Sequence, residues 1–428
     1  MTPAARLQGA IDILEALAKT DQPLDRLLRD WFRTRRYAGS KDRAAITQRV
    51  FTIQRHRASL AWRMQAETPR ALAIASLLQS GEEPDSLFTG GGYGPAELTD
   101  AERAAIAQPP RGDAPVHVRG EFPAFLEPEL TRAFGSNLLD EMLALQSRAP
   151  VDLRVNTLKR ERSEVLDALR AREFPAEPTP FAPHGIRIAS GEGSAELGRS
   201  VMFETGAFEF QDEAAQIASL LCQARPGERI LDLAAGAGGK SLALAATMQN
   251  KGEIVACDIR QPALQQLAAR ATRAGATIIR THLTEKEPPE GPFDAVLVDA
   301  PCTGTGTWRR QPELRWRLSP ELLKARMALQ DKLLDQAAAR VKKGGRLIYA
   351  TCSILPCENE DRANAFLARH PDFAVRPCAQ VWRESDEAPP GMGQFFKASP
   401  RSTGTDGFFA GVFIHNPAAA GSLDKPRG

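Results

Sequence analysis

The chain has 428 residues, of which 43% are hydrophobic and 25% are charged, values typical of a globular protein with two or three domains. No stretch approaches the ~18 consecutive apolar residues of a membrane-spanning helix, so a transmembrane helix is excluded. The first segment, MTPAARLQGAIDIL, is amphipathic and contains Asp12, so it does not read as a signal peptide, and we expect a cytoplasmic protein.

The net charge of +2 hides an uneven distribution along the chain. Residues 1–63 contain 13 Lys or Arg and 6 Asp or Glu, whereas residues 64–148 contain 6 and 13. A basic segment is either an electrostatic footprint for nucleic acid or the solvated face of a helical bundle. Charge alone leaves both interpretations open.

The first 145 residues predict a helical domain. Apolar residues recur at helical spacing within 7–17, 24–32 and 46–64, and again within 125–145. Between them, glycine- and proline-rich segments indicate an irregular, acidic stretch over 66–120.

Residues 146–200 predict a small α+β connector. The expected elements are a helix over 163–172 with Ser163 as its N-cap, and strands over 151–158 and 185–189.

From residue 201 to 416, strands and helices alternate. We expect helices over 241–248, 262–274 and 320–341, and strands over 230–233, 254–257, 295–298, 346–350 and 408–414. Apolar strands separated by helices predict a parallel, doubly wound sheet. The small, polar residues of 417–428 predict a disordered tail.

Four polar features follow strands of the predicted sheet, and ligands of such sheets bind at the carboxyl ends of the strands. These are the glycine-rich turn DLAAGAGGKS over 232–241, Asp258, Asp299 and Cys352. The small residues of the turn allow close approach to a ligand, and the helix after it offers free N–H groups. Asp258, twenty residues after Gly238, suits ribose hydroxyls, so the pattern favours an adenosyl cofactor.

The end of the turn also resembles a phosphate-binding P-loop, because Gly239, Lys240 and Ser241 match its last three positions. The strand ending at Asp299 resembles one that presents a magnesium-binding carboxylate. Against this interpretation, Ala234 stands where a P-loop requires its first glycine.

Six cysteines are present, without a CxxC pair and without histidine pairs at zinc-site spacing, so we expect neither disulfides nor a metal ion. Cys222 and Cys257 lie in apolar segments and predict small core residues. Cys302 and Cys352 each lie just past a strand, where a site would form, and indicate either catalytic residues or a redox pair.

Several motifs, in order, resemble the RsmB/NOP/Sun family of RNA 5-methylcytosine methyltransferases. They are LRVNTLK at 153–159, ETGAFEFQD at 204–212, DAPCTGTG at 299–306 followed by RRQPELRW at 309–316, YATCSILPCEN at 349–359, and TDGFFA at 405–410. The helical start, with KDR at 41–43, resembles the NusB-like RNA-binding domain of the RsmB branch. The resemblance implies a Rossmann-like, S-adenosylmethionine-dependent methyltransferase domain after a NusB-like domain and an RNA-binding connector.

The chain departs from the family pattern in two places. The cofactor turn of the family usually has a cysteine and a proline where this chain has Ala234 and Ala237. The family also has an aspartate in its third conserved sequence motif. This aspartate is absent here, and His282 lies near its place. The cofactor-binding residues implied are Asp258, Asp299 and the turn, Ala234, Ala235, Gly236, Ala237, Gly238, Gly239 and Lys240.

The resemblance also implies a mechanism. Cys352 would attack C6 of a cytosine, so that C5 becomes nucleophilic and takes the methyl group. Cys302 would assist release of the adduct, Asp299 would bind the base edge, and Lys240 would lower a nearby pKa or hold substrate. The Pro-Cys element of DNA cytosine methyltransferases leaves Cys302 open as an alternative nucleophile.

The expected partner is RNA, and 16S ribosomal RNA is preferred over transfer RNA. We expect the protein to act as a monomer and not to bind a membrane. Four arginines, Arg309, Arg310, Arg315 and Arg317, are candidates for phosphate contacts, and Trp316 either stacks on a base or packs in a core. A P-loop ATPase and a non-catalytic RNA-binding protein remain as alternative functions.

Overall fold

The computed structural model describes residues 1–108, 110, 112–188, 193–285, 287–385 and 387–415. The chain forms two compact units. The first contains Met1–Ser147 and Trp308–Leu318, and the second contains Arg148–Thr307 and the chain from Ser319 onward. The division into 1–145, 146–200 and 201–416 therefore stays a prediction, and the predicted tail, 417–428, lies outside the described residues. No helix within the described ranges is both long and apolar enough to cross a membrane.

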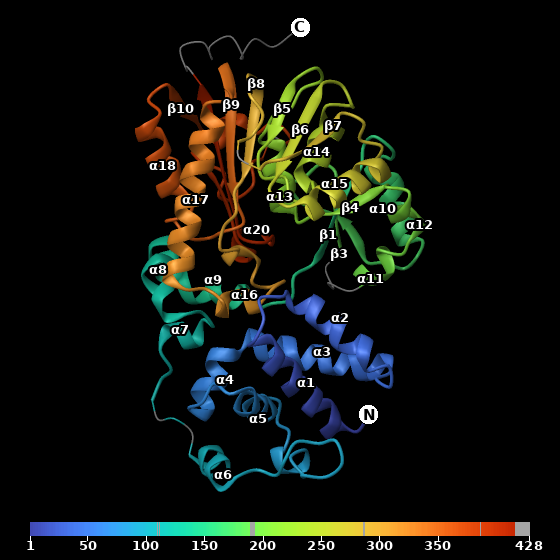
Figure 1. Cartoon of the computed structure of the whole chain (residues 1–428), viewed down its shortest axis with the longest axis vertical. Helices are drawn as coiled ribbons and strands as arrows, with labels where there is room; N and C mark the ends of the chain where they lie inside the picture. The colour runs from blue at the N-terminus through green and yellow to red at the C-terminus, as the bar shows by residue number, and fades with distance from the viewer. Residues whose placement is uncertain (109, 111, 189–192, 286, 386, 416–428) are drawn as a thin grey trace. The chain divides into compact units, whose positions relative to one another are not determined.

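The first unit is helical, as predicted (Figure 1). Its helices are α1 (Pro3–Leu17), α2 (Leu24–Thr34), α3 (Ser40–Arg55), α4 (Arg57–Met64), α5 (Pro69–Gln79), α6 (Asp100–Ala107), α7 (Val116–Arg119), α8 (Glu127–Phe134), α9 (Leu138–Ala144) and α16 (Glu313–Trp316). Helix α1 begins where Thr2 accepts the Ala5 N–H, with proline at its first position. Its apolar stripe, including Leu7 and Ile11, is buried.

The expectation of an irregular stretch over 66–120 was wrong where α5 forms in its first part and where the shorter α6 and α7 form later. Helix α5 begins there because Thr68 accepts the N–H of Ala71 and Pro69 occupies its first position. Seven consecutive residues of this helix, 71–77, are buried. Because a helix that is apolar on all sides shows no periodicity, the spacing pattern missed it.

The second unit begins with a small antiparallel sheet in the order β2-β3-β1-β4. Its elements are β1 (Val151–Val155), α10 (Arg162–Arg170), β2 (Ala176–Pro178), β3 (Gly185–Ile188), α11 (Ser194–Leu197), α12 (Val201–Glu204) and β4 (Phe208–Phe210). Ser163 is not the N-cap of α10. Glu161 takes that position, because Glu164 accepts its N–H at 3.1 Å and the helix starts one residue before Ser163.

The larger sheet has the order β10-β12-β9-β8-β5-β6-β7, with β11 paired to β12. Its strands are β5 (Arg229–Asp232), β6 (Glu253–Asp258), β7 (Ile279–Leu283), β8 (Phe293–Asp299), β9 (Val341–Thr351), β10 (Phe373–Arg376), β11 (Phe396–Ala398) and β12 (Phe408–His415). Strands β5 to β9 pair in parallel, which confirms the Rossmann-like α/β fold. The sheet is not wholly parallel, however, because β12 runs antiparallel to β9, β10 and β11.

Helices cover both faces of this sheet (Figure 1). They are α13 (Glu213–Leu220), α14 (Gly239–Thr247), α15 (Gln261–Ala274) and α19 (Cys378–Val381) on one face, and α17 (Pro320–Ala338) and α18 (Glu360–Arg369) on the other; α20 (Pro400–Thr403) precedes β12. The expected helix over 320–341 ends at Ala338, and β9 begins at Val341. A hydrophobic core lies on each face of the sheet, and adjacent residues of β5 point into different cores. Ile230 packs in the core under α13 and α14, and Leu231 packs in the core under α17 and α18.

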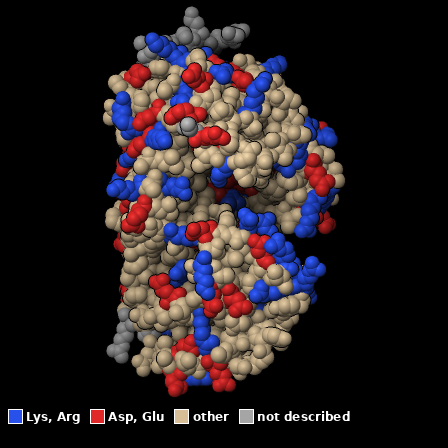
Figure 2. All heavy atoms as spheres, viewed as in Figure 1, with Lys and Arg blue, Asp and Glu red and all other residues tan. Residues whose placement is uncertain are grey.

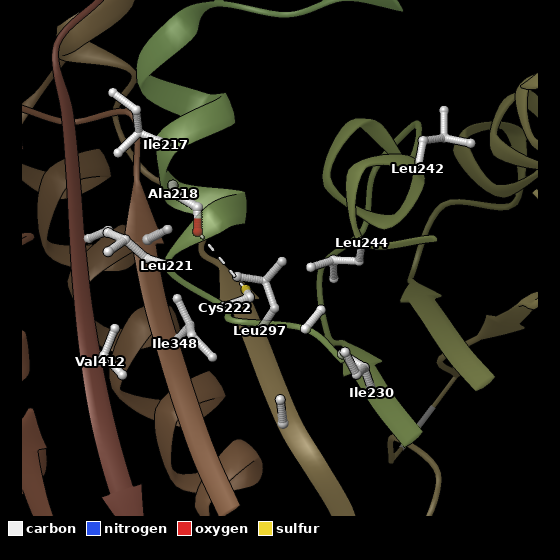
Figure 3. Close-up of a cluster of buried hydrophobic side chains, with 14 of the residues drawn as sticks. Ile217, Ala218, Leu221, Cys222, Ile230, Leu242, Leu244, Leu297, Ile348 and Val412 are labelled. Atoms are coloured by element: carbon white, nitrogen blue, oxygen red, sulfur yellow. Dashed lines mark hydrogen bonds between the residues drawn. The ribbon is translucent and has the colours of Figure 1, made fainter. Parts of the chain in front are cut away.

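Cys222 illustrates the first of these cores (Figure 3). It is fully buried beside Leu221, Leu244 and Ile348, and its thiol donates to the carbonyl of Ala218, at 3.9 Å. Burial raises its pKa to about 12, so it stays a neutral thiol. Cys222 is therefore a small core residue, as the sequence indicates.

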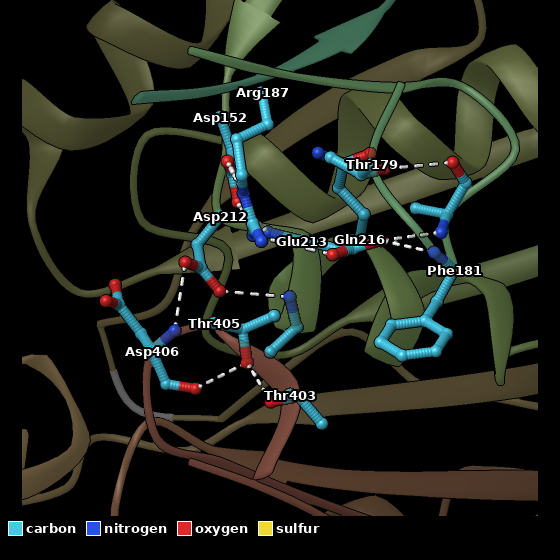
Figure 4. A network of polar contacts seen from close by, with 12 residues as sticks. Asp152, Thr179, Phe181, Arg187, Asp212, Glu213, Gln216, Thr403, Thr405 and Asp406 are labelled. Carbon is cyan, nitrogen blue, oxygen red and sulfur yellow. Dashed lines mark hydrogen bonds and ion pairs between the residues drawn. The ribbon is translucent and has the colours of Figure 1, made fainter. Parts of the chain in front are cut away.

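A buried polar network joins the small sheet to the larger one (Figure 4). Arg187 on β3 forms two 2.7 Å hydrogen bonds to Asp152 on β1 and contacts Glu213 at 3.4 Å. Asp152 also accepts the Glu213 N–H at 3.1 Å, at the start of α13. Because these carboxylates are fully buried, the network fixes where β1 meets α13.

Candidate active site

The parallel strands bring the predicted site residues to one edge of the larger sheet. Strand β5 ends at Asp232, β6 at Asp258 and β8 at Asp299, while Cys352 directly follows β9. The β8–β9 register pairs Asp299 with Ala350, so the chain segments carrying Cys302 and Cys352 leave the sheet side by side. This edge is where open α/β sheets bind ligands.

The two cysteine sulfurs lie 3.3 Å apart. The hydrogen bond to Cys352, burial, and the negative charges of Cys352 and Glu358 together hold the pKa of Cys302 well above its usual range. The two thiols therefore share one hydrogen bond, and Cys302 keeps its proton. Fifty residues separate them in the sequence, so this contact depends entirely on the fold.

Lys240 and Asp299 form an ion pair at the same edge. The Nζ atom of Lys240 lies 2.6 Å from Oδ2 of Asp299, and Lys240 is only 8% exposed. Burial alone would lower the pKa of Lys240, but the negative charges of Asp299, Asp232 and Cys352 raise it above its ordinary value. The buried ammonium group stays charged and lies close enough to Cys352 to interact with it electrostatically.

The glycine-rich turn is tightly constrained on one side. Gly238 has φ +81°, and a Cβ added there would lie 2.4 Å from Cγ of Leu267. Gly236 faces open space, since the nearest atom to a Cβ added there is a guanidinium nitrogen of Arg260 at 3.7 Å. The turn therefore requires glycine at 238 and leaves one side open for a ligand.

Asp258 lies beside this open side and accepts the N–H of Gly236 at 2.9 Å. Arg260 donates to both its carboxylate oxygens at 3.0 Å. Burial would raise the pKa of Asp258, but the hydrogen bonds and charge of Arg260 hold it below its usual value. Because the Arg260 side chain is 66% exposed, it can leave Asp258 at little cost.

The local geometry disfavours the P-loop interpretation. The serine of a P-loop presents its hydroxyl to a magnesium ion. Here Ser241 is fully buried and donates to Oδ2 of Asp232 at 2.6 Å. Its hydroxyl is therefore committed to the core of the turn.

Two arginines that the sequence did not single out support the turn. Arg270 on α15 donates to the carbonyl of Ala237 at 2.7 Å and is held by Glu209 at 2.9 Å. Arg154 on β1 is buried and contacts the carbonyl of Gly239 at 3.3 Å. No local pattern marks these side chains, because their partners are distant in sequence.

Four arginines over 309–317 were expected to hold phosphates, and this expectation was wrong for Arg309 and Arg315, which are buried in the first unit. Arg315 is fully buried and donates to the carbonyls of Glu121 and Leu145. Arg309 is buried too, and Arg317 donates to the carbonyls of Thr20, Asp21 and Gln22. Burial lowers the pKa of Arg315 to about 10. Arg315 therefore binds loop carbonyls away from solvent, whereas the half-buried Arg310 and Arg317 stay predicted phosphate contacts.

Trp316 and His282, the two other residues that the sequence left ambiguous, are also placed. The indole N–H of Trp316 donates to the carbonyl of Gln54 at 2.7 Å, which favours the packing interpretation. His282 lies on β7 opposite Cys257 of β6.

The chain is similar to known methyltransferases. The family model described as 16S rRNA methyltransferase RsmB/F matches residues 219–414, and a ferredoxin-like domain model of RsmF/B-like methyltransferases matches residues 122–193. A probable ribosomal RNA small subunit methyltransferase B of Synechocystis sp. is 34% identical over 60% of this chain and 58% of its own length.

Two further curated relatives carry similar names. The probable ribosomal RNA small subunit methyltransferase B of Bacillus subtilis is 29% identical over 67% of this chain. The ribosomal RNA small subunit methyltransferase B of Yersinia pseudotuberculosis is 31% identical over 68% of this chain. The chain spans 65% and 66% of the length of these two relatives, slightly less than two thirds.

Among solved structures, PH0851 has a TM-score of 0.75 at 25% identity, over 96% of this chain and 99% of its own. A methyltransferase homolog from Pyrococcus horikoshii has a TM-score of 0.60 at 25% identity, over 70% and 97%. NSun6 from the same organism, solved with SFG, shares the fold with a TM-score of 0.60 at 19% identity, over 69% and 98%.

Proposed function

Because the chain belongs to the RsmB/RsmF family of methyltransferases, we propose that it methylates C5 of a cytosine in small-subunit ribosomal RNA. S-adenosylmethionine is the proposed methyl donor, and the enzyme acts as a cytoplasmic monomer without a metal ion. The observation that carries the proposal is the 3.3 Å contact between Cys302 and Cys352 beside the Lys240–Asp299 pair. Ribosomal RNA is preferred over transfer RNA because the relatives' names refer to it.

The residues at the strand ends fit an adenosyl cofactor. The open side of Gly236 lies next to the carboxylate of Asp258, and a carboxylate there suits ribose hydroxyls once Arg260 moves aside. The turn over 234–240 and Asp299 complete the proposed binding site. The alanines at 234 and 237, where the family usually has cysteine and proline, offer no polar side-chain atom to the cofactor. When bound, S-adenosylmethionine supplies a methyl group made electrophilic by its sulfonium.

Cys352 is the proposed nucleophile. Its thiolate forms a bond to C6 of the cytosine, and the electrons of the C5–C6 double bond shift so that C5 takes the methyl group. Transfer of the C5 proton to a solvent water molecule then returns an electron pair to the ring, which restores the C5–C6 double bond and expels the sulfur of Cys352. The positive charge of Lys240 lies near Cys352, at the place where the reacting sulfur and base would meet.

Cys302 and Asp299 have different proposed roles. Because Cys302 keeps its proton next to the Cys352 sulfur, it can return a proton to that sulfur as the adduct breaks down. Asp299, held by Lys240 at the end of β8, can accept a hydrogen bond from the amino group of the base. The target base must leave its stack to reach these groups.

The helical unit supplies a proposed RNA contact around the loop between α2 and α3. Tyr37 is 71% exposed there, next to Arg36 and close in sequence to Lys41, both also exposed. An exposed aromatic ring among cations suits unpaired bases and phosphates. On the face drawn in Figure 2, basic and acidic side chains are interspersed, so a local contact of this kind is more informative than the net charge.

Methyl transfer tests the proposal. Purified protein with labelled S-adenosylmethionine and unmodified small-subunit RNA should label RNA, and digestion should place the label in 5-methylcytidine. Label in another nucleoside would contradict the proposal. So would the absence of label in an RNA that a related enzyme methylates under the same conditions. ATP hydrolysis without methyl transfer would instead restore the P-loop alternative.

A further inference from the structure

Glu358, which was not among the predicted site residues, lies buried between two loops. One is the Cys302 loop, which follows β8, and the other is the Cys352 loop, which follows β9. Glu358 follows β9 by seven residues and precedes α18, and its side chain is fully shielded from solvent. One carboxylate oxygen accepts the backbone N–H of Thr303 at 2.9 Å. The other accepts the hydroxyls of Thr303 and Ser353, the latter at 2.6 Å.

These contacts join the residue after one cysteine to the residue after the other. Thr303 follows Cys302, and Ser353 follows Cys352. Two more bonds link the same loops: the hydroxyls of Thr305 and Ser353 lie 3.0 Å apart, and the N–H of Gly306 donates to the carbonyl of Cys352 at 3.0 Å. The carboxylate of Glu358 is the only group among these that bonds both post-cysteine residues at once in the described chain.

The hydroxyl groups next to Glu358 point their protons towards it, so the side chain at position 358 must accept hydrogen bonds. The backbone N–H of Leu355 donates to the Ser353 oxygen at 3.1 Å, and that of Ile354 donates to the Thr305 oxygen at 3.0 Å. With their oxygens accepting, the proton of Thr305 points to Ser353 and that of Ser353 to Glu358. Gln330 on α17 adds a further donor at 2.9 Å. Only a carboxylate accepts all of these bonds.

We propose that Glu358 is a positioning residue that holds the Cys302 and Cys352 loops together and so sets the distance between the two thiols. Its effect on methyl transfer rests on the proposed function, but its effect on the thiols does not. The negative charge of Glu358 is also among the causes that keep Cys302 protonated, consistent with a role for that thiol as a proton donor.

The test compares E358Q with E213Q. Glutamine keeps the shape of Glu358 but presents an NH2 group where two hydroxyls need an acceptor, so the loops separate. Glu213 is an equally buried carboxylate that accepts the N–H groups of Phe181 and Ala182, away from the cysteines. E213Q therefore reports the cost of altering a buried carboxylate elsewhere in the same unit. Thermal unfolding of both variants shows that each is folded.

The first readout is formation of the Cys302–Cys352 disulfide by diamide, which takes two electrons and two protons from the thiols. Its rate, followed by mass spectrometry of tryptic peptides, reports the sulfur separation without RNA or cofactor. We expect a rate at least about tenfold lower in E358Q and unchanged in E213Q. The second readout is methylation, for which kcat should fall about 10²-fold in E358Q with unchanged KM for both substrates, as expected for misplaced reacting groups.

An unchanged disulfide rate in folded E358Q would overturn the proposal. So would an equal loss in both variants, because the effect would then be general destabilisation. If E358Q slows disulfide formation but the wild-type protein methylates no RNA, the positioning role stands and the proposed function fails. If E358Q does not fold, T303V replaces it, because this substitution removes only the hydroxyl bond from Thr303 to Glu358. T303V must then slow disulfide formation by a smaller factor. An unchanged rate in T303V overturns the proposal.

Discussion

The sulfur atoms of Cys302 and Cys352 lie 3.3 Å apart at the ends of neighbouring parallel strands, although fifty residues separate them in the chain. Because a disulfide bond is about 2.05 Å long, a small movement of either side chain would allow one to form. The pair is thus close enough for oxidation, although neither role proposed for it in methyl transfer is a redox role.

We therefore predict reversible inactivation by peroxide. Hydrogen peroxide oxidises the two thiols to a disulfide and is itself reduced to water, which removes the nucleophile. Methylation activity should be lost and should return with dithiothreitol. C302A should instead lose its remaining single-turnover reaction irreversibly, because Cys352 then has no adjacent thiol and proceeds to higher oxidation states. Reversible inactivation of C302A to the same extent would contradict this prediction.

The Asp258–Arg260 pair predicts opposite effects of two neighbouring substitutions on cofactor affinity. D258A removes the proposed acceptor for the ribose hydroxyls and should raise the Kd for S-adenosylmethionine roughly tenfold or more. R260A removes a competitor for that carboxylate and should leave the Kd unchanged or lower it. Isothermal titration calorimetry measures both. A larger loss in R260A than in D258A would show that Arg260, not Asp258, binds the cofactor.

Asp232 predicts a pH dependence of stability. Burial raises its pKa to about 7, and its Oδ1 atom has no hydrogen-bond partner among the described residues. The folded state binds the Asp232 proton more tightly than the unfolded state does. The contribution of Asp232 to the free energy of unfolding is therefore greatest below pH ~4 and falls as the pH rises towards 7. Its contribution to the loss is at most roughly 4 kcal/mol.

D232N isolates this contribution, because asparagine cannot ionise. The variant should gain stability relative to the wild type as the pH rises from 4 to 8. Denaturant unfolding at several pH values measures the difference between the two proteins. A constant difference across this range would show that Asp232 is not the group responsible.

The exposed loop between α2 and α3 predicts a salt-dependent RNA contact. The double variant R36A/K41A removes two cations and should reduce the slope of log K against log salt by about 1.4, if both neutralise phosphates of single-stranded RNA. Y37A should weaken binding at every salt concentration by about 1–3 kcal/mol, because it removes a stacking surface. R132A, which removes an arginine of α8 that pairs with Glu129, serves as the control and should change neither quantity. An unchanged slope in R36A/K41A would place the RNA contact elsewhere.

The sequence predicted the parallel part of the fold well, because its signals are local. The strand before the glycine turn, the helix after it and the carboxylates at strand ends all follow from short patterns around Gly238, Asp258 and Asp299. The antiparallel direction of β12 was not predictable in this way, because an apolar strand has the same composition in either direction.

Long-range polar contacts were also missed. Arg315 occurs in a basic segment and reads as a phosphate ligand, yet it is buried and bound to loop carbonyls of the helical unit. Glu358 reads as one more charged residue before a helix, and only the fold brings Thr303 and Ser353 to it. A sequence pattern shows which residue types are present, but the partners of a buried charge depend on tertiary structure.

The central claim is that Cys352 attacks the cytosine and Cys302 releases it. The most direct test incubates C302A with S-adenosylmethionine and substrate RNA, digests the product and identifies the linked peptide by mass spectrometry. We predict a stable adduct between a methylated cytidine and the peptide containing Cys352, and no adduct in C352A. An adduct on Cys302 in C352A, or methylation activity retained by C352A, would contradict the assignment.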